Sequence, residues 1–134
     1  MNEIIYLERQ TCVMTERNGQ EDVYIVVKQT NFLLCLTSRI PLQNTDIICE
    51  LYYDIPERKP VPYVNQKPIQ YKFQQVSSEE INVECKVSVL SSKHEDMNFK
   101  IKCIVLSNGE AVGEVFSHPI RCASKIDQDR KSVV

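Results

Sequence analysis

The stretch Ile81-Asn-Val-Glu-Cys-Lys-Val-Ser-Val89 decides the fold class. Its odd-numbered positions are apolar or cysteine, and its even-numbered positions are all polar. Because successive side chains of a strand point to opposite faces, this alternation predicts a half-buried β-strand. Cys85 shares the parity of Val83 and Val87, so we expect its thiol in the core.

The same period of two recurs along the whole chain, and no sustained helical period occurs. Strands are predicted over Ile4–Leu7, Thr11–Thr15, Val23–Lys28, Phe32–Leu36, Asp46–Tyr53, Ile69–Gln74, Ile81–Leu90, Asn98–Leu106 and Val115–Ala123. Turn-forming residues separate several of them, most clearly Asn108-Gly109 between two β-rich segments. The pattern predicts an all-β fold, an immunoglobulin-like β-sandwich of about seven to nine strands.

Composition agrees with a single folded domain. The chain has 134 residues, of which 43% are hydrophobic and 25% charged, and the formal net charge is −2. We expect the domain to occupy residues 1–125 and a polar tail to occupy residues 126–134. No apolar window is long enough to span a membrane, and the start of the sequence lacks the basic and apolar regions of a signal peptide. The net charge excludes a protein that coats nucleic acid through an overall positive field.

The six cysteines are widely spaced and form no C-x-x-C pair. Cys49, Cys85 and Cys103 share the parity of apolar neighbours, and free cysteine behaves as a small buried hydrophobe. A chain without a signal peptide is expected in a reducing compartment. We therefore predict six reduced thiols, with an intersheet disulfide between Cys49 and Cys103 as the alternative.

The sequence shows no arrangement typical of catalysis or metal binding. His94 and His118 are not at metal-ligand spacing from each other or from another ligand. We expect His94 at a solvated hairpin tip and His118 partly buried, because it shares the parity of Phe116 and Ile120. Neighbouring carboxylates such as Glu95 and Asp96 diverge and make no acid/base pair. We predict that the protein is not an enzyme and uses no metal or cofactor.

A more specific pattern joins two distant segments. Ser91, His94, Phe99 and Ile101 mark the first, and Ser117, Pro119, Ile120, Ser124 and Lys125 mark the second, with Cys122 where valine is usual. Together they resemble the immunoglobulin-like DNA-binding domains of Rel and STAT class transcription factors, nearest the CudA-type group of amoebae. The resemblance covers about residues 46 to 131 and is best over 81 to 125. The arginine-rich recognition loop of Rel proteins has only a faint counterpart, around Arg9 and Arg17.

The resemblance implies sequence-specific binding of double-stranded DNA by part of a transcription regulator in the nucleus. Further partners would be a second copy of the chain or other transcription proteins. It places the DNA contacts in the hairpin turn, at the exit from the last strand and in the first connection: Lys93, His94, Arg121, Lys125, Arg130, Lys131, Arg9 and Arg17. The parity of Arg121 is opposite to that of Ile120 and Cys122, which predicts a guanidinium free for a ligand.

Two alternatives stay open at this point. The basic residues near the end of the chain have a simpler interpretation as a solvated charged segment. The domain as a whole fits a β-sandwich interaction or adaptor module without DNA binding, which would use an edge strand or the proline-rich segment 56–68. Steep salt dependence of binding would distinguish DNA from a partner strand.

Overall fold

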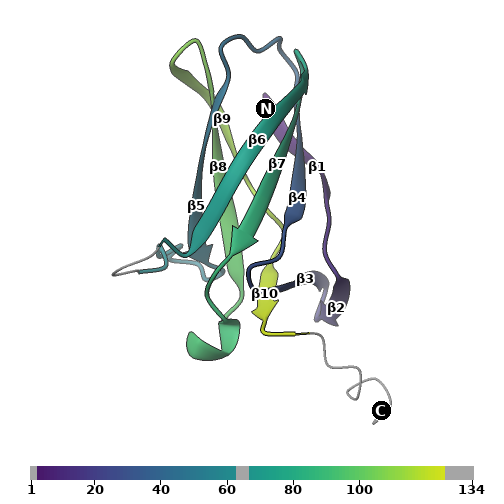
Figure 1. The fold of residues 1–134 in the computed structure, drawn as a ribbon, viewed down its shortest axis with the longest axis vertical. Coiled ribbons are helices and arrows are strands. Elements are labelled where there is room, and N and C mark those ends of the chain that lie inside the picture. Colours follow the sequence, from purple (N-terminus) through teal and green to yellow (C-terminus); the bar gives the residue numbers. More distant parts are fainter. Residues whose placement is uncertain (1–2, 63–66, 126–134) are drawn as a thin grey trace.

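The computed structural model describes residues 3–62 and 67–125, which form a two-layer β-sandwich (Figure 1). The strands are β1 (Ile5–Gln10), β2 (Met14–Asn18), β3 (Glu21–Val27), β4 (Phe32–Ser38), β5 (Asp46–Tyr53), β6 (Ile69–Ser77), β7 (Glu80–Val87), β8 (Phe99–Ser107), β9 (Glu110–Phe116) and β10 (Ile120–Ala123), and a 3₁₀ helix, η1, spans Ser91–Lys93. The prediction of an all-β sandwich is confirmed. Ten strands are present in the described residues where seven to nine were expected. The described part of the chain contains no helix long and apolar enough to cross a membrane.

One sheet has the antiparallel order β1-β4-β7-β6. The other has the order β2-β3-β10-β8-β5, and β9 also pairs with β8. Within this second sheet β10 runs parallel to β3, with Ala123 opposite Val27. This parallel pair brings the end of β3 beside the end of β10, although the two segments are far apart in the sequence.

The largest difference from the predicted strands lies near the end of the chain. Val115–Ala123 was expected as one strand, whereas β9 ends at Phe116 and β10 begins at Ile120. Both strands border β8 on the same side, since Phe116 lies opposite Lys102 and Ile120 lies opposite Phe99. Proline lacks the N–H that a ladder needs, so Pro119 is suited to the gap between the two strands.

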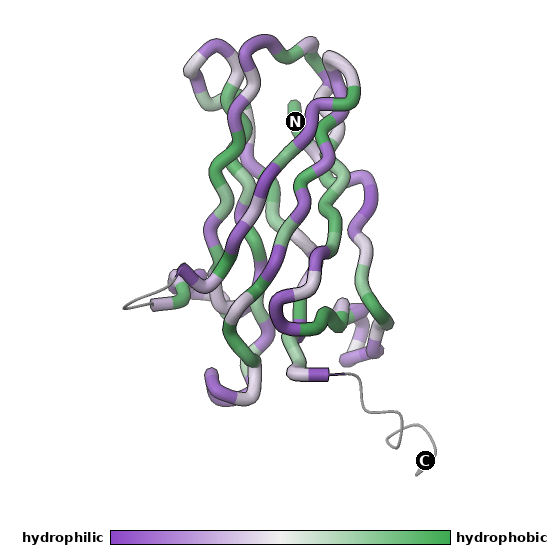
Figure 2. The backbone as a smooth tube through the Cα atoms, viewed as in Figure 1, coloured by the Kyte–Doolittle hydropathy of each residue, from purple (hydrophilic) through white to green (hydrophobic). Residues whose placement is uncertain are grey.

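The core follows the predicted alternation. In β7 the residues Ile81, Val83, Cys85 and Val87 are buried, and in β8 the residues Phe99, Ile101, Cys103 and Val105 are buried. Figure 2 shows hydrophobic and hydrophilic residues alternating along the long strands. Burial of one face of each sheet therefore fixes the register of the strands that carry the loops.

All six cysteines are free thiols, and Cys49, Cys85, Cys103 and Cys122 are buried. Cys49 and Cys103 lie opposite each other on β5 and β8 of the same sheet, with their Sγ atoms 3.5 Å apart. The alternative of an intersheet disulfide is therefore wrong. The hydrogen bond with Cys49, together with burial, raises the pKa of the Cys103 thiol well above its ordinary value. Burial also raises the pKa of Cys122 to about 11, so both thiols stay protonated.

The strand connections gather at the two ends of the sandwich (Figure 1). The exit end, at the bottom of the view, comprises residues 11–13, 28–31, 54–62, 67–68, 88–98 and 124–125. The opposite end comprises the start of the described chain, residues 39–45, and the turns before β7 and β9. The predicted polar tail, residues 126–134, lies outside the described residues, so the predicted domain boundary stays a prediction.

Candidate nucleic-acid interface

Backbone hydrogen bonds join the separate segments of the exit end into one surface. The Lys28 N–H donates to the Ala123 carbonyl at 2.8 Å, and the Gln29 N–H donates to the Val87 carbonyl at 3.0 Å. The Ser88 N–H donates to the Pro68 carbonyl at 2.8 Å. These bonds tie the start of the β3–β4 connection to the ends of β10 and β7, and the start of the β7–β8 connection to the end of the β5–β6 connection.

The β7–β8 connection, residues 88–98, is attached to the strands of the sandwich at two points. Ser91 is fully buried, and its Oγ accepts a hydrogen bond from the Cys122 N–H at 3.0 Å. The Tyr53 hydroxyl and His94 Nδ1 share a hydrogen bond of 2.7 Å, while the His94 ring meets Phe99 edge to face. His94 is therefore half-buried, and the expectation of a solvated hairpin tip is wrong for this residue.

The electrostatic environment of this anchor keeps the Tyr53 phenol protonated. Burial raises the pKa of Tyr53, and the nearby Glu95 carboxylate raises it further. A protonated phenol can donate to Nδ1 of His94 or accept from it, so the hydrogen bond forms with either tautomer of the imidazole. The anchor thus positions the neighbouring residue Lys93 on a loop that is fixed at its base.

Three exposed lysines, Lys28, Lys93 and Lys125, form what we term the exit-end lysine cluster. Lys28 follows β3 and Lys125 follows β10, and these two strands are parallel neighbours that end at the same level. Lys93 belongs to η1, which packs against β10. None of the three forms an ion pair within the described residues. Unpaired ammonium groups on a fixed surface are suited to contact phosphates.

Arg121 is not free, and the prediction of an available guanidinium is wrong. Its Nη2 forms an ion pair with Asp96 Oδ1 at 3.1 Å, and its Nη1 donates to the Asp96 carbonyl at 3.5 Å. The side chain of Arg121 is 30% exposed and that of Asp96 is 70% exposed. Strand parity placed Arg121 on the outer face correctly, but parity within one strand does not reveal which loop covers that face.

Arg9 and Arg17 lie within strands, not in the connections of the exit end. Arg17 lies in β2 and forms an ion pair with Asp22 of the β2–β3 hairpin at 3.2 Å. Arg9 lies in β1 of the other sheet, and its guanidinium contacts Cys35 Sγ at 3.7 Å. The remaining predicted contacts, Arg130 and Lys131, lie outside the described residues.

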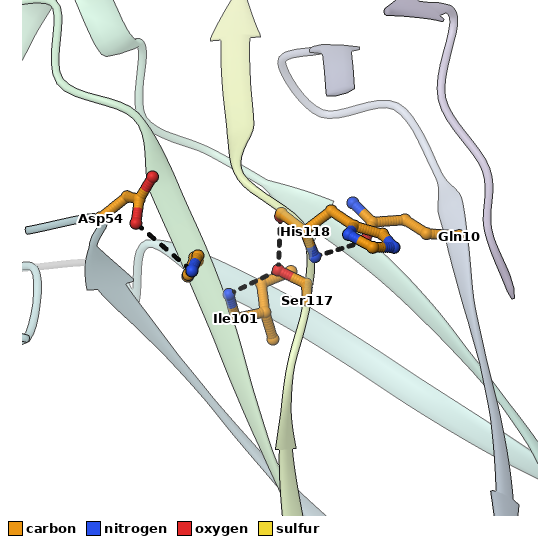
Figure 3. Close-up of polar contacts among 6 residues, drawn as sticks. Gln10, Asp54, Ile101, Ser117 and His118 are labelled. Carbon is orange, nitrogen blue, oxygen red and sulfur yellow. Dashed lines mark hydrogen bonds and ion pairs between the residues drawn. The ribbon is translucent and has the colours of Figure 1, made fainter. Parts of the chain in front are cut away.

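His118 is exposed, so the expectation of a partly buried histidine is wrong. The His118 ring stacks on Tyr24 with centroids 4.8 Å apart. The backbone N–H of His118 donates to Gln10 Oε1 at 2.8 Å (Figure 3). The neighbouring residue Ser117 is buried instead of His118. The Ser117 Oγ accepts a hydrogen bond from the Ile101 N–H at 2.9 Å. The break between β9 and β10 therefore interrupts the alternation from which the burial of His118 was predicted.

Lys28 is the residue that sequence reasoning missed. The polar segment Lys28-Gln-Thr-Asn31 marks a connection between two strands, but nothing local shows at which end of the sandwich it lies. The parallel pairing of β3 with β10 decides that point. Among the described residues, no three His, Cys, Asp or Glu side chains are arranged to hold a metal ion.

The opposite end carries the reverse charge. Its connections and the strand residues that flank them contain five carboxylates against one described basic residue: Glu3, Asp46, Glu79, Glu80 and Glu110, with Arg39. The described exit-end connections contain six basic residues against four carboxylates, so a polyanion is repelled at the opposite end and favoured at the exit end, even though the whole chain has a net charge of −2.

Fold and site together define a two-sheet β-sandwich domain with a basic exit end. The model of the DG1062 N-terminal domain family matches residues 6–133 of the chain. The protein therefore belongs to the DG1062 N-terminal domain family.

The chain is similar to segments of two longer Dictyostelium discoideum proteins. "Putative transcriptional regulator cudA" is 34% identical over 142 residues, which cover 97% of this chain and 18% of that protein. "Developmental gene 1062 protein" is 27% identical over 164 residues, which cover 94% of this chain and 27% of that protein. The predicted resemblance to the CudA-type group is confirmed. The chain spans less than a third of the length of either relative.

Proposed function

We propose that this domain binds double-stranded DNA in a sequence-specific manner, as part of a transcription regulator that acts in the nucleus. The observation that carries the proposal is the exit-end lysine cluster, in which Lys28, Lys93 and Lys125 lie together without carboxylate partners in the described residues. The similarity to a relative named as a transcriptional regulator supports it. In this proposal the domain is an immunoglobulin-like DNA-binding domain of the Rel and STAT class, and it acts by binding rather than by catalysis.

In the proposed mode of binding, lysine and arginine have different roles. Lysines of the cluster contact phosphates and orient the domain, a contribution that carries no sequence information. Arg121 reads a base edge, because a guanidinium matches the O6 and N7 acceptors of guanine. The acidic opposite end turns away from the duplex. Arg130 and Lys131 are proposed as further phosphate contacts. A dimer of the chain, or a complex with other transcription proteins, would extend the site to two half-sites.

Selection from a random duplex library, followed by salt titration on the selected duplex, tests this function. We expect an enriched sequence and an affinity that falls steeply with salt. In a plot of log K against log salt concentration, each phosphate contact contributes about −0.9 to the slope, so the three lysines of the cluster contribute about −3 and contacts by Arg130 and Lys131 make the slope steeper. Absence of duplex binding at low salt would contradict the proposal.

A second candidate function rests on strand β6, which forms one edge of its sheet and exposes Tyr71 and Val76. An exposed edge can accept an extended partner peptide through main-chain hydrogen bonds. The proline-rich segment is less suited to that role, because the Val61 N–H already donates to the Leu51 carbonyl at 3.0 Å on the edge of β5. Binding to a protein partner with little salt dependence, and no binding to duplex DNA, would favour this function.

A further inference from the structure

The contact between Arg121 and Asp96 lies next to the lysine cluster and joins two elements. Arg121 comes from β10, and Asp96 comes from the β7–β8 connection. Asp96 is held where it meets the guanidinium, since its N–H donates to the Ser91 carbonyl at 2.9 Å. Its φ of 58° lies in the left-handed region, which aspartate and asparagine tolerate better than most residues. The carboxylate is therefore placed on the arginine by the fold of the loop.

The chemistry of the contact makes Asp96 a competitor of DNA. The N–H groups that bind Asp96 Oδ1 and the Asp96 carbonyl are those that a phosphate or a guanine edge would need. Both side chains are partly exposed, and ion pairs of this kind are weak. A ligand with two well-placed acceptors can therefore replace the carboxylate, whereas a poorly placed one gains little from doing so.

We propose that Asp96 is a specificity-determining residue, which occupies Arg121 in the free protein and on non-target DNA and releases it only to a target base pair. This inference rests on the proposed DNA-binding function. In the absence of a target base, the Asp96 carboxylate both satisfies Arg121 and repels nearby phosphates. Non-target binding then depends on the phosphate contacts of the lysine cluster, Arg130 and Lys131, and target binding adds the contact of Arg121 with a base.

The test compares Asp96→Asn with Glu95→Gln in the full chain, on the selected duplex and on a scrambled duplex. Asparagine suits the left-handed backbone, and the two variants remove the same charge from neighbouring residues. Asp96→Asn is expected to tighten binding to the scrambled duplex about threefold more than binding to the selected duplex, the magnitude typical of an exposed ion pair. Glu95→Gln is expected to change both affinities by the same factor.

Adding Arg121→Gln tests whether the effect passes through the arginine. In that background Asp96→Asn should no longer change the ratio of the two affinities, because the residue that it releases is missing. Thermal unfolding of each variant checks the fold, which the Ser91 and His94 anchors should maintain, and Asp96→Ser provides a second substitution.

Three outcomes would overturn the inference. Equal effects of Asp96→Asn and Glu95→Gln would reduce the contact to a general charge effect. Weaker binding of Asp96→Asn to both duplexes would mean that Asp96 only supports the loop. An unchanged ratio of affinities in Asp96→Asn would also contradict it. In all three cases the parent protein still binds duplex DNA, so the proposed function stands; failure of the parent to bind would instead remove the function and the inference together.

Discussion

The two ends of the sandwich are built from the same kind of strand connection, yet they use their polar groups differently. At the opposite end the connections bind one another: the Asn108 N–H donates to the Gln43 carbonyl at 2.8 Å, and Asn44 Nδ2 donates to Asn108 Oδ1 at 2.8 Å. At the exit end the anchors lie beneath the surface, at Ser91 and His94. Lys28, Lys93 and Lys125 of the exit end are therefore available to a ligand, whereas the connections of the opposite end bind one another and are acidic.

The largest expected effect concerns the core beneath the exit end. Val87 is fully buried, and its carbonyl accepts the Gln29 N–H. Val87→Asp should unfold the domain because it buries a charge without a partner. Lys86→Asp places the same group on the other face of β7 and should leave the fold intact. Urea unfolding followed by circular dichroism measures both, and equal tolerance of the two changes would contradict the strand register.

The anchors of the two ends should differ in strength. Ser91→Ala removes a fully buried hydroxyl and leaves the buried Cys122 N–H without its acceptor, so it should lower the free energy of unfolding by about 1–3 kcal/mol. Ser107→Ala at the opposite end removes hydrogen bonds with Gln43 that are solvent-accessible, and should cost about 0.5–1 kcal/mol. Chemical denaturation of both variants gives the comparison. An equal loss of stability in the two variants, or a larger loss in Ser107→Ala, would mean that the buried Ser91 hydroxyl does not hold the exit end in place.

A smaller effect is expected from the buried thiols at alkaline pH. The pKa of Cys122 is raised from 9.0 to about 11 in the folded protein, and that of Cys103 is raised as well. Because the unfolded state loses these protons first, the stabilisation is complete below pH 9 and declines as the pH rises toward 11. Each thiol should reduce the free energy of unfolding by about 1 kcal/mol per pH unit in this range. Denaturation at several pH values checks this, and Cys122→Ala should show a shallower dependence; identical pH profiles would exclude a contribution from Cys122.

Residues in long regular strands were the ones that sequence could place. The period of two located β7 and β8 and buried Cys49, Cys85 and Cys103 as expected, because each strand has one face against the core. Strand parity did not predict the surroundings of His118 and Arg121. The break between β9 and β10 around Pro119 interrupts the alternation, so His118 is exposed instead of partly buried. Arg121 is paired with Asp96, a carboxylate from a connection that parity within β10 does not reveal. Lys28 was missed because its position at the exit end depends on a parallel strand pair that joins distant segments.

The contrast between the two ends is tested most directly by measuring duplex binding against salt for two triple variants. One replaces Lys28, Lys93 and Lys125 with alanine, and the other replaces Arg39, Lys72 and Lys86, so both lose three positive charges. The exit-end triple variant should retain its thermal stability, bind duplex DNA at least tenfold more weakly and show a salt slope that is shallower by about two to three units. The control triple variant should keep nearly the parent slope. Equal binding by the two variants, or an unchanged slope in the exit-end triple variant, would contradict the assignment of the DNA-binding surface to the exit end.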